Sequence, residues 1–386
     1  MKTLQHFTLA AALAALATFT ACGGGGGIGG SGASPEGTMR LQLTDAPACG
    51  YDAVNVTVQK VRVHASSSAA DSDAGWYELA LAPARRVDLL SLSNGVLTTL
   101  GQIALPAGNY TQMRLVLAAN DAAAPLANSV VPTGGSETAL TTPSAQQSGI
   151  KLNMNVAVPA DKVVDAVIDF DACKSVVKRG NSGQYNLKPV ISVTPVLSDA
   201  GLRVVGYALP GTSISVQAAG VPLKATLADA LGQFVLYPVP VGSYDLVFTA
   251  AGRVTAVLTG VPVVDTAYTV LNSTATPVSL PATAVAARTV SGSVTPATAT
   301  VRALQTLTGG PTIEVAWAAV DDASGAFSVV LPLDAPLRAA YGSTWVFAAD
   351  PAAAGRYTLE AASAGSVKTL AIDVTAVVPP VTFSFP

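Results

Sequence analysis

Few side chains in this sequence have the type and spacing that hydrolytic chemistry requires. Ser148 and Lys151 have the S-x-x-K spacing of a serine nucleophile and its lysine base. That motif has to open a helix, whereas the alternating residues from Leu152 to Val156 predict a strand. The S-D-N and K-T-G motifs that complete such a site are also absent from the sequence. We therefore expect no serine hydrolase.

Three aspartates are the weak candidates for metal or acid–base chemistry. Asp165, Asp169 and Asp171 share one parity along a predicted strand, so their carboxylates could face the same side. They could then bind calcium or form a general acid and base pair. The alternative is a solvated strand face, with Asp171 capping the turn before Cys173. No D-x-D-x-D-G loop is present in the sequence, so we predict no metal site and no cofactor.

Histidine chemistry is nearly excluded by composition. The chain has two histidines, His6 in the N-terminal segment and His64 at the end of an alternating stretch from Val54 to Val63. With His6 in the predicted signal, only His64 remains for chemistry, so a multi-histidine metal site lacks its ligands and a catalytic triad would depend on this one strand-end side chain. The formal net charge is −3 without long runs of either sign, so we expect no nucleic-acid partner.

The N-terminus has the features of an export signal. Lys2 precedes a short apolar run from Phe7 to Phe19, and Thr20 and Ala21 lead into Cys22. This run is shorter than the roughly 20 residues that a transmembrane helix needs. The segment resembles the lipobox of bacterial lipoproteins, which implies a signal peptide over residues 1–21 and a lipid on Cys22. An ordinary cleaved signal with an incidental cysteine is the alternative.

The lipobox resemblance also implies a location in the cell. Residues 22–36 form a glycine-rich linker after the lipidated cysteine. Gly23, rather than Asp, follows the cysteine, as in lipoproteins that are sent to the outer membrane. We therefore expect a protein of the cell envelope, held by its lipid at the outer membrane and facing the periplasm or the cell surface.

Two further cysteines, Cys49 and Cys173, complete the set. In an exported protein, two remaining cysteines most simply form a disulfide. Loop entropy alone would then contribute about 4–5 kcal/mol to stability. Two free buried thiols are the alternative.

Period-two alternation dominates from Met39 onward and predicts an all-β chain. Strands are expected over residues 39–43, 54–63, 76–80, 85–90, 111–117, 150–156 and 163–170. Residues 120–147, which are rich in Ala, Pro, Ser and Thr, are expected to form an irregular insertion. The predicted fold is an N-terminal β-rich, sandwich-like domain followed by two small prealbumin-like or Ig-like β-sandwiches.

Five ordered motifs identify the N-terminal domain over residues 37–197. They are Leu43–Pro47, Val87–Gly95, Leu105–Leu115, Asp169–Ala172 and Tyr185–Val190. Together they resemble a bacterial family catalogued as domain of unknown function 4382. The resemblance implies an exported, often lipid-anchored β-rich domain, and it supplies no catalytic residue.

The rest of the chain shows a weak internal repeat. A D-x-x-G-x-F turn and a later Y-x-L strand occur over residues 198–280 and again over residues 281–386. Both copies resemble the carboxypeptidase regulatory-like domain, which has a carbohydrate-binding-like fold. The second copy departs from that pattern by an insertion between Leu331 and Arg356.

These observations favour a non-catalytic envelope protein with a structural, adhesion or interaction role. The alternative is a module that binds carbohydrate or another envelope polymer through its C-terminal repeats. Trp317, Trp345 and Tyr341 are its candidate ligand-binding residues, since exposed aromatic rings stack on sugars. Core packing is the other use for these side chains.

Overall fold

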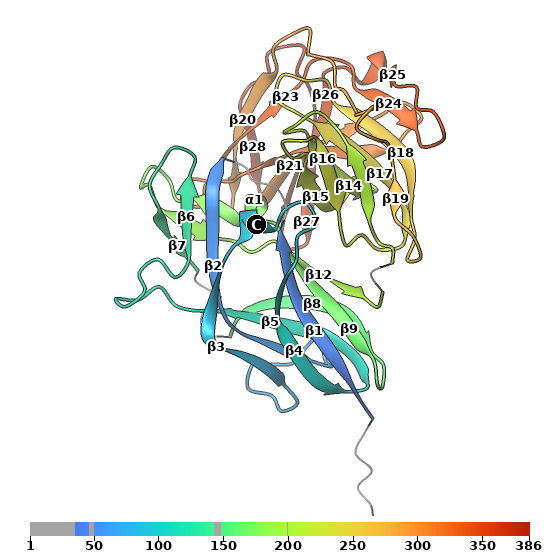
Figure 1. The fold of residues 1–386 in the computed structure, drawn as a ribbon. Coiled ribbons are helices and arrows are strands. Elements are labelled where there is room, and N and C mark those ends of the chain that lie inside the picture. The colour runs from blue at the N-terminus through green and yellow to red at the C-terminus, as the bar shows by residue number, and fades with distance from the viewer. Residues whose placement is uncertain (1–34, 46–49, 143–147, 199) are drawn as a thin grey trace, which may run out of the picture. The chain divides into compact units, whose positions relative to one another are not determined.

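The computed structural model describes residues 35–45, 50–142, 148–198 and 200–386. Cys22 and Cys49 lie outside the described residues. Residues 35–386 form one compact unit, and its described strands build three large hydrophobic cores and two smaller clusters. We call the segments around these cores the first β region (35–198), the second β region (200–280) and the third β region (288–385). The described chain is all-β and of sandwich type, as predicted from the alternation (Figure 1).

The first β region contains a four-stranded and an eight-stranded sheet. In the smaller sheet β1 pairs in parallel with β9 and antiparallel with β4. Its order is β12 (Ile191–Val196), β9 (Val163–Phe170), β1 (Glu36–Asp45) and β4 (Thr98–Pro106). The larger sheet has the order β10 (Val176–Lys178), β11 (Tyr185–Leu187), β7 (Thr138–Thr141), β6 (Ser129–Pro132), β2 (Tyr51–His64), β5 (Gly108–Leu117) and β8 (Ile150–Val158), with β3 (Tyr77–Asp88) paired to β2.

The alternation predicted for the first β region is observed in its strands. In β8, Leu152, Met154 and Val156 are buried, whereas the residues between them are exposed. Lys151 therefore lies in a strand, and the helix that an S-x-x-K site requires is not formed there. The expectation of an irregular insertion over residues 120–147 was wrong in part, because β6 and β7 form there.

The second β region contains a three-stranded sheet and a six-stranded sheet. The first has the order β16 (Gln233–Leu236), β13 (Val204–Tyr207) and β19 (Thr269–Val270). The second has the order β15 (Val221–Leu227), β14 (Ser213–Ala218), β17 (Gly242–Thr249), β18 (Ala256–Val263), β24 (Leu337–Ala340) and β25 (Ala348–Ala349). Phe234 and Phe248 meet edge to face in the core, with ring centroids 5.9 Å apart.

The third β region repeats this arrangement with a three-stranded and a four-stranded sheet. Their orders are β23 (Ala326–Leu331), β20 (Arg288–Thr295) and β28 (Val381–Ser384), and β22 (Thr312–Ala318), β21 (Thr300–Thr306), β26 (Arg356–Ser363) and β27 (Ser366–Asp373). Helical structure in the described chain is limited to α1 (Ala172–Ser175) and the 3-10 turns Leu89–Leu92 and Pro351–Ala353. No described helix is long and apolar enough to cross a membrane.

One tyrosine turn recurs in the regions and explains the insertion in the third. In the P-x-G-x-Y turns before β5 and β17, the hydroxyls of Tyr110 and Tyr244 donate to the carbonyls of Pro106 and Pro240, at 3.0 and 2.9 Å. In the third region Tyr357 makes the same bond to Pro332 at 2.7 Å. The residues between Pro332 and Tyr357 are looped out and supply β24 and β25, so β24 pairs in parallel with β18 of the second region.

The repeated D-x-x-G-x-F turn also differs between the copies. In the second region the Asp229 carboxylate accepts hydrogen bonds from the backbone of Leu231 and Gln233, and Gly232 has a φ of 81°. In the third region Asp321 takes this role instead of Asp322, through the backbone N–H groups of Ala323 and Ser324. Asp322 is thereby left available for a contact with the first β region.

Candidate functional site

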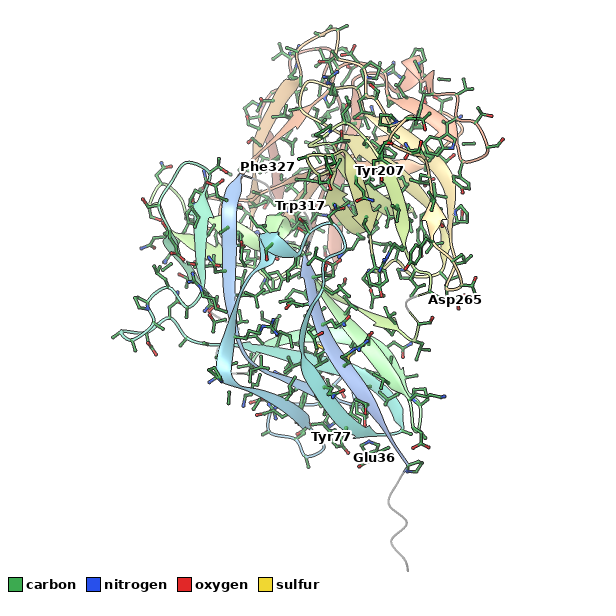
Figure 2. All side chains as sticks on the ribbon, viewed as in Figure 1. Glu36, Tyr77, Tyr207, Asp265, Trp317 and Phe327 are labelled. Carbon is green, nitrogen blue, oxygen red and sulfur yellow. The ribbon has the colours of Figure 1, made fainter. Side chains whose placement is uncertain are left out.

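The three β regions meet at a cavity of about 290 Å³. Each region contributes charged or polar side chains to its wall, and β22 adds the ring of Trp317 (Figure 2). The charged and amide residues of the wall are Asp169, Asp171, Lys174, Gln217, Lys224 and Glu314. Ligand sites commonly form where polar groups converge between domains. We call this candidate site the junction cavity.

A buried ion pair joins the first and second regions at this cavity. Lys224 projects from β15, and its ammonium lies 2.7 Å from a carboxylate oxygen of Asp169 on β9. The lysine side chain is only 2% exposed and the aspartate side chain 11%. Because little water reaches this pair, the attraction between the two charges is only weakly screened. That attraction offsets the free-energy cost of removing each charge from water.

Glu314 of the third region is bound by both other regions. Its backbone N–H and C=O pair with the side-chain amide of Gln217, each at 2.8 Å. Gln217 is 1% exposed. Its side-chain amide pairs with the Glu314 backbone in the way that the backbone of a neighbouring strand would. The Glu314 carboxylate accepts from Lys174 of the first region at 2.9 Å and lies 3.4 Å from Arg302. A single residue thus links all three regions.

Asp171 contributes a buried carboxyl group to the cavity. It caps α1 by accepting a hydrogen bond from the Lys174 backbone at 3.0 Å. Burial raises the pKa of the Asp171 carboxyl, and the nearby carboxylates of Asp169 and Glu314 raise it further, whereas Lys174 lowers it. A carboxyl of this kind takes up a proton more readily than an exposed one.

A second joint connects the first and third regions beside the junction cavity. Asp322 lies 2.5 Å from the ammonium of Lys188 and accepts a hydrogen bond from Asn186 at 2.6 Å. These residues line an adjoining cavity of about 520 Å³, which shares Lys174 and Trp317 with the junction cavity. The Lys174 ammonium lies 4.8 Å from the centroid of the Trp317 ring. Trp317 therefore lines both cavities.

Of the three predicted aspartates, Asp169 and Asp171 both line the junction cavity, whereas Asp165 lies apart from them. Asp165 pairs with Arg40 through two contacts of 2.5 and 2.7 Å and lines a different cavity. Asp169 pairs with Lys224. Asp171 caps α1, as the alternative interpretation has it, but the solvated strand face of that interpretation was wrong, because the Asp165 and Asp169 side chains are only 13% and 11% exposed. Within the described ranges, no three His, Cys, Asp or Glu side chains are grouped so that they could hold a metal ion.

The three predicted aromatic residues do not all lie in one place. Trp317 lines the junction cavity, but Trp345 and Tyr341 pack against the core of the second region. Trp345 also donates its indole N–H to the carbonyl of Gly342 at 3.1 Å. Because β24 joins the sheet of the second region, the insertion carries Trp345 and Tyr341 with it, and the three rings form no common platform.

Cys173 lies in α1 and is half-buried, while its predicted partner Cys49 and the predicted lipidation site Cys22 lie outside the described residues. The disulfide and the lipid therefore stay predictions. His64 is half-buried at the end of β2, where its Nδ1 accepts from the Ser66 backbone at 2.9 Å and its Nε2 lies 3.0 Å from the carbonyl of Ala74. These two contacts fix the loop that follows.

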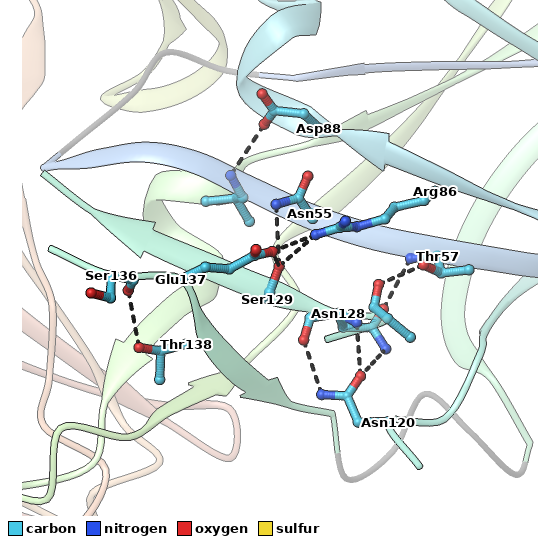
Figure 3. A network of polar contacts seen from close by, with 12 residues as sticks. Asn55, Thr57, Arg86, Asp88, Asn120, Asn128, Ser129, Ser136, Glu137 and Thr138 are labelled. Atoms are coloured by element: carbon cyan, nitrogen blue, oxygen red, sulfur yellow. Dashed lines mark hydrogen bonds and ion pairs between the residues drawn. The ribbon is translucent and has the colours of Figure 1, made fainter. Parts of the chain in front are cut away.

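A polar network around β6 was missed in the sequence because its members are distant along the chain (Figure 3). The Asn128 side chain is buried, and its Oδ1 accepts from the Thr57 backbone at 3.0 Å. Glu137 accepts from the Ser129 hydroxyl and from Arg86, each at 2.5 Å. The Ser129 bond, and then Arg86, lower the pKa of the Glu137 carboxyl. The network fixes the β6–β7 hairpin against β2.

Residues 36–189 match the model of the family described as "Domain of unknown function (DUF4382)". The match confirms, for this part of the chain, the resemblance carried by the five motifs. It brings no activity with it. No curated protein matches the chain.

Among solved structures, the chain is similar to an N-terminal and a C-terminal interface mutant of a type II Cohesin-X-Dockerin complex from Acetivibrio cellulolyticus. The sequence identities are 23% and 26%, and the TM-score is 0.20 in both cases. Each match covers 22% of this chain and 61% of the other, less than two thirds of those chains. A TM-score this low carries no inference about fold or partner.

Proposed function

We propose that this protein is a lipid-anchored, non-catalytic component of the cell envelope, which presents its three β regions as one rigid unit for a structural, adhesion or interaction role. The lipid on Cys22 is its contact with the membrane, at the outer membrane and facing the periplasm or the cell surface. Its partner in this role is another envelope component.

One observation carries this proposal: apart from Asp171, which caps α1, the charged groups of the junction cavity are committed to contacts between regions. Glu314 is held by Gln217 and Lys174, and Lys224 by Asp169. A carboxylate or lysine engaged in this way holds domains in place rather than meeting a substrate. Such contacts suit a protein whose surface has to keep a fixed shape.

The anchor is tested by labelling cells with a fatty acid and separating membrane from soluble fractions. The wild type is expected to incorporate the label and to stay with the outer membrane. A Cys22→Ser variant is expected to lose both. Label that persists in Cys22→Ser, or a wild type found wholly in the soluble fraction, would refute the lipid anchor.

A carbohydrate-binding role is the second candidate, and it is favoured by the position of Trp317. The ring lies beside two cavities whose walls carry hydroxyl, amide and carboxylate groups, and these are the groups that bind sugar hydroxyls. Ser192, Ser213 and Ser215 add hydroxyls to the junction cavity. The site is thus the boundary between regions and not an exposed face of the C-terminal repeat.

A glycan array distinguishes the two aromatic positions. Under this second candidate, Trp317→Ala loses glycan binding, whereas Trp345→Ala keeps it and loses stability, because Trp345 packs against the second core. Trp345→Phe is the control that keeps a ring in that core. Binding that depends on Trp345 and not on Trp317 would exclude the junction cavity as the sugar site.

A further inference from the structure

Arg203, at the start of the second β region, has an unusual environment for a positively charged side chain. The guanidinium of Arg203 is held between two tyrosine rings, 4.2 Å from the centroid of Tyr237 and 4.7 Å from that of Tyr268. Tyr237 is buried at 3% exposure, while Tyr268 is 48% exposed. The backbone around Arg203 is also fixed, because Thr269 donates to the Arg203 carbonyl at 2.8 Å. The guanidinium plane is therefore oriented before any ligand arrives.

Within the described ranges, this arginine lacks the acidic partner that several others have. Arg40, Arg62, Arg86 and Arg302 each form an ion pair with a carboxylate. Among the residues that the structure describes, Arg203 forms none, and its buried Nε has no hydrogen-bond partner. The tyrosine faces attract the positive charge but accept no in-plane hydrogen bond from its N–H groups.

Arg203 borders a cavity of about 480 Å³ between the first and second regions. Arg40 and Asp165 also line it, but they neutralise each other through their bidentate pair. Gln42 and Ser198 add uncharged polar groups to the wall. One positive charge, supplied by Arg203, is thus left over among the described side chains of this cavity.

We propose that this cavity binds an oxyanion, namely a carboxylate, phosphate or sulfate group, through the guanidinium of Arg203. A planar guanidinium recognises such groups with paired hydrogen bonds, and stacking against tyrosine orients it for that contact. The ligand supplies the acceptors that the described chain does not. This site is separate from the junction cavity, and it holds whether or not that cavity binds a sugar.

The test is titration calorimetry of the full-length chain at low ionic strength with inorganic phosphate, sulfate and galacturonate as separate probes. At least one probe is expected to bind, and the ranking of the three identifies which oxyanion the site prefers. Arg203→Gln is expected to weaken binding by about tenfold or more, the order expected for hydrogen bonds to a charged group. Arg356→Gln, at an exposed arginine of the third region, is the matched control and is expected to bind as the wild type does.

Three further variants keep the test decisive if Arg203→Gln folds poorly. Tyr268→Ala removes an exposed ring and is expected to weaken binding several-fold, whereas Tyr268→Phe is expected to retain it. Asp199 lies outside the described residues, and Asp199→Asn removes a carboxylate close to Arg203 in sequence. No binding of any probe, equal binding by Arg203→Gln and the wild type, or binding that appears only in Asp199→Asn would each overturn the proposal.

Discussion

Replacing Lys224 by methionine tests the buried joint between the first and second regions most sharply. The substitution removes the ammonium that lies 2.7 Å from Asp169 and leaves that carboxylate 11% exposed without its cation. Breaking a buried pair by removing one partner costs about 3–5 kcal/mol. With an unfolding entropy of about 2.1 cal/mol/K per residue, a chain of this length would lose roughly 4–7 °C in Tm.

The assay is thermal and urea-induced unfolding followed by circular dichroism, with two comparisons. The double variant Lys224→Met with Asp169→Leu replaces the whole pair by apolar groups and is expected to regain most of the lost stability. Lys60→Met, in a pair with Glu78 whose side chains are 34% and 39% exposed, is expected to cost less than about 1 kcal/mol. The reasoning fails if Lys224→Met costs no more than Lys60→Met, or if the double variant is the least stable of the three.

Three further predictions concern the Gln217 amide, the Asp171 carboxyl and the cysteine pair. Gln217→Ala leaves the buried N–H and C=O of Glu314 without partners and should cost about 2–4 kcal/mol in urea unfolding; a loss under about 0.5 kcal/mol would show that the amide pairing is not structural. Because burial raises the pKa of Asp171, its contribution to stability is present below the unfolded pKa and is lost as pH rises through the higher folded pKa; wild type should therefore lose stability relative to Asp171→Asn as pH rises from about 4, and the opposite trend would contradict the direction of the shift. Non-reducing mass spectrometry of the exported protein should recover a peptide cross-linked through Cys49 and Cys173, and two alkylatable thiols would exclude it.

The sequence predicted the local part of this structure well. Alternation predicted β8 as a strand, because residues such as Leu152 and Met154 alternate between core and solvent over a few positions. The two P-x-G-x-Y turns are local in the same sense, since the hydrogen bonds from Tyr110 and Tyr244 span only four positions. Patterns within a single turn or strand therefore carry their own structural information.

The junction cavity could not be predicted in the same way. Gln217 and Glu314 are 97 positions apart, and neither lies in a motif that points to the other. The insertion before Tyr357 was visible as a gap in the repeat, but its pairing with β18 depends on which neighbouring sheet edge is free. The same limit applies to Trp345, whose environment follows from that pairing.

Whether the three regions act as one unit is tested most directly by differential scanning calorimetry of the chain from Pro35 to Pro386. If the joints at Glu314 and Lys224 lock the regions together, the wild type unfolds in a single transition whose calorimetric and van't Hoff enthalpies agree. Gln217→Ala and Lys224→Met then shift that whole transition to lower temperature. Separate transitions for the regions, with the variants leaving all of them unchanged, would contradict a rigid unit.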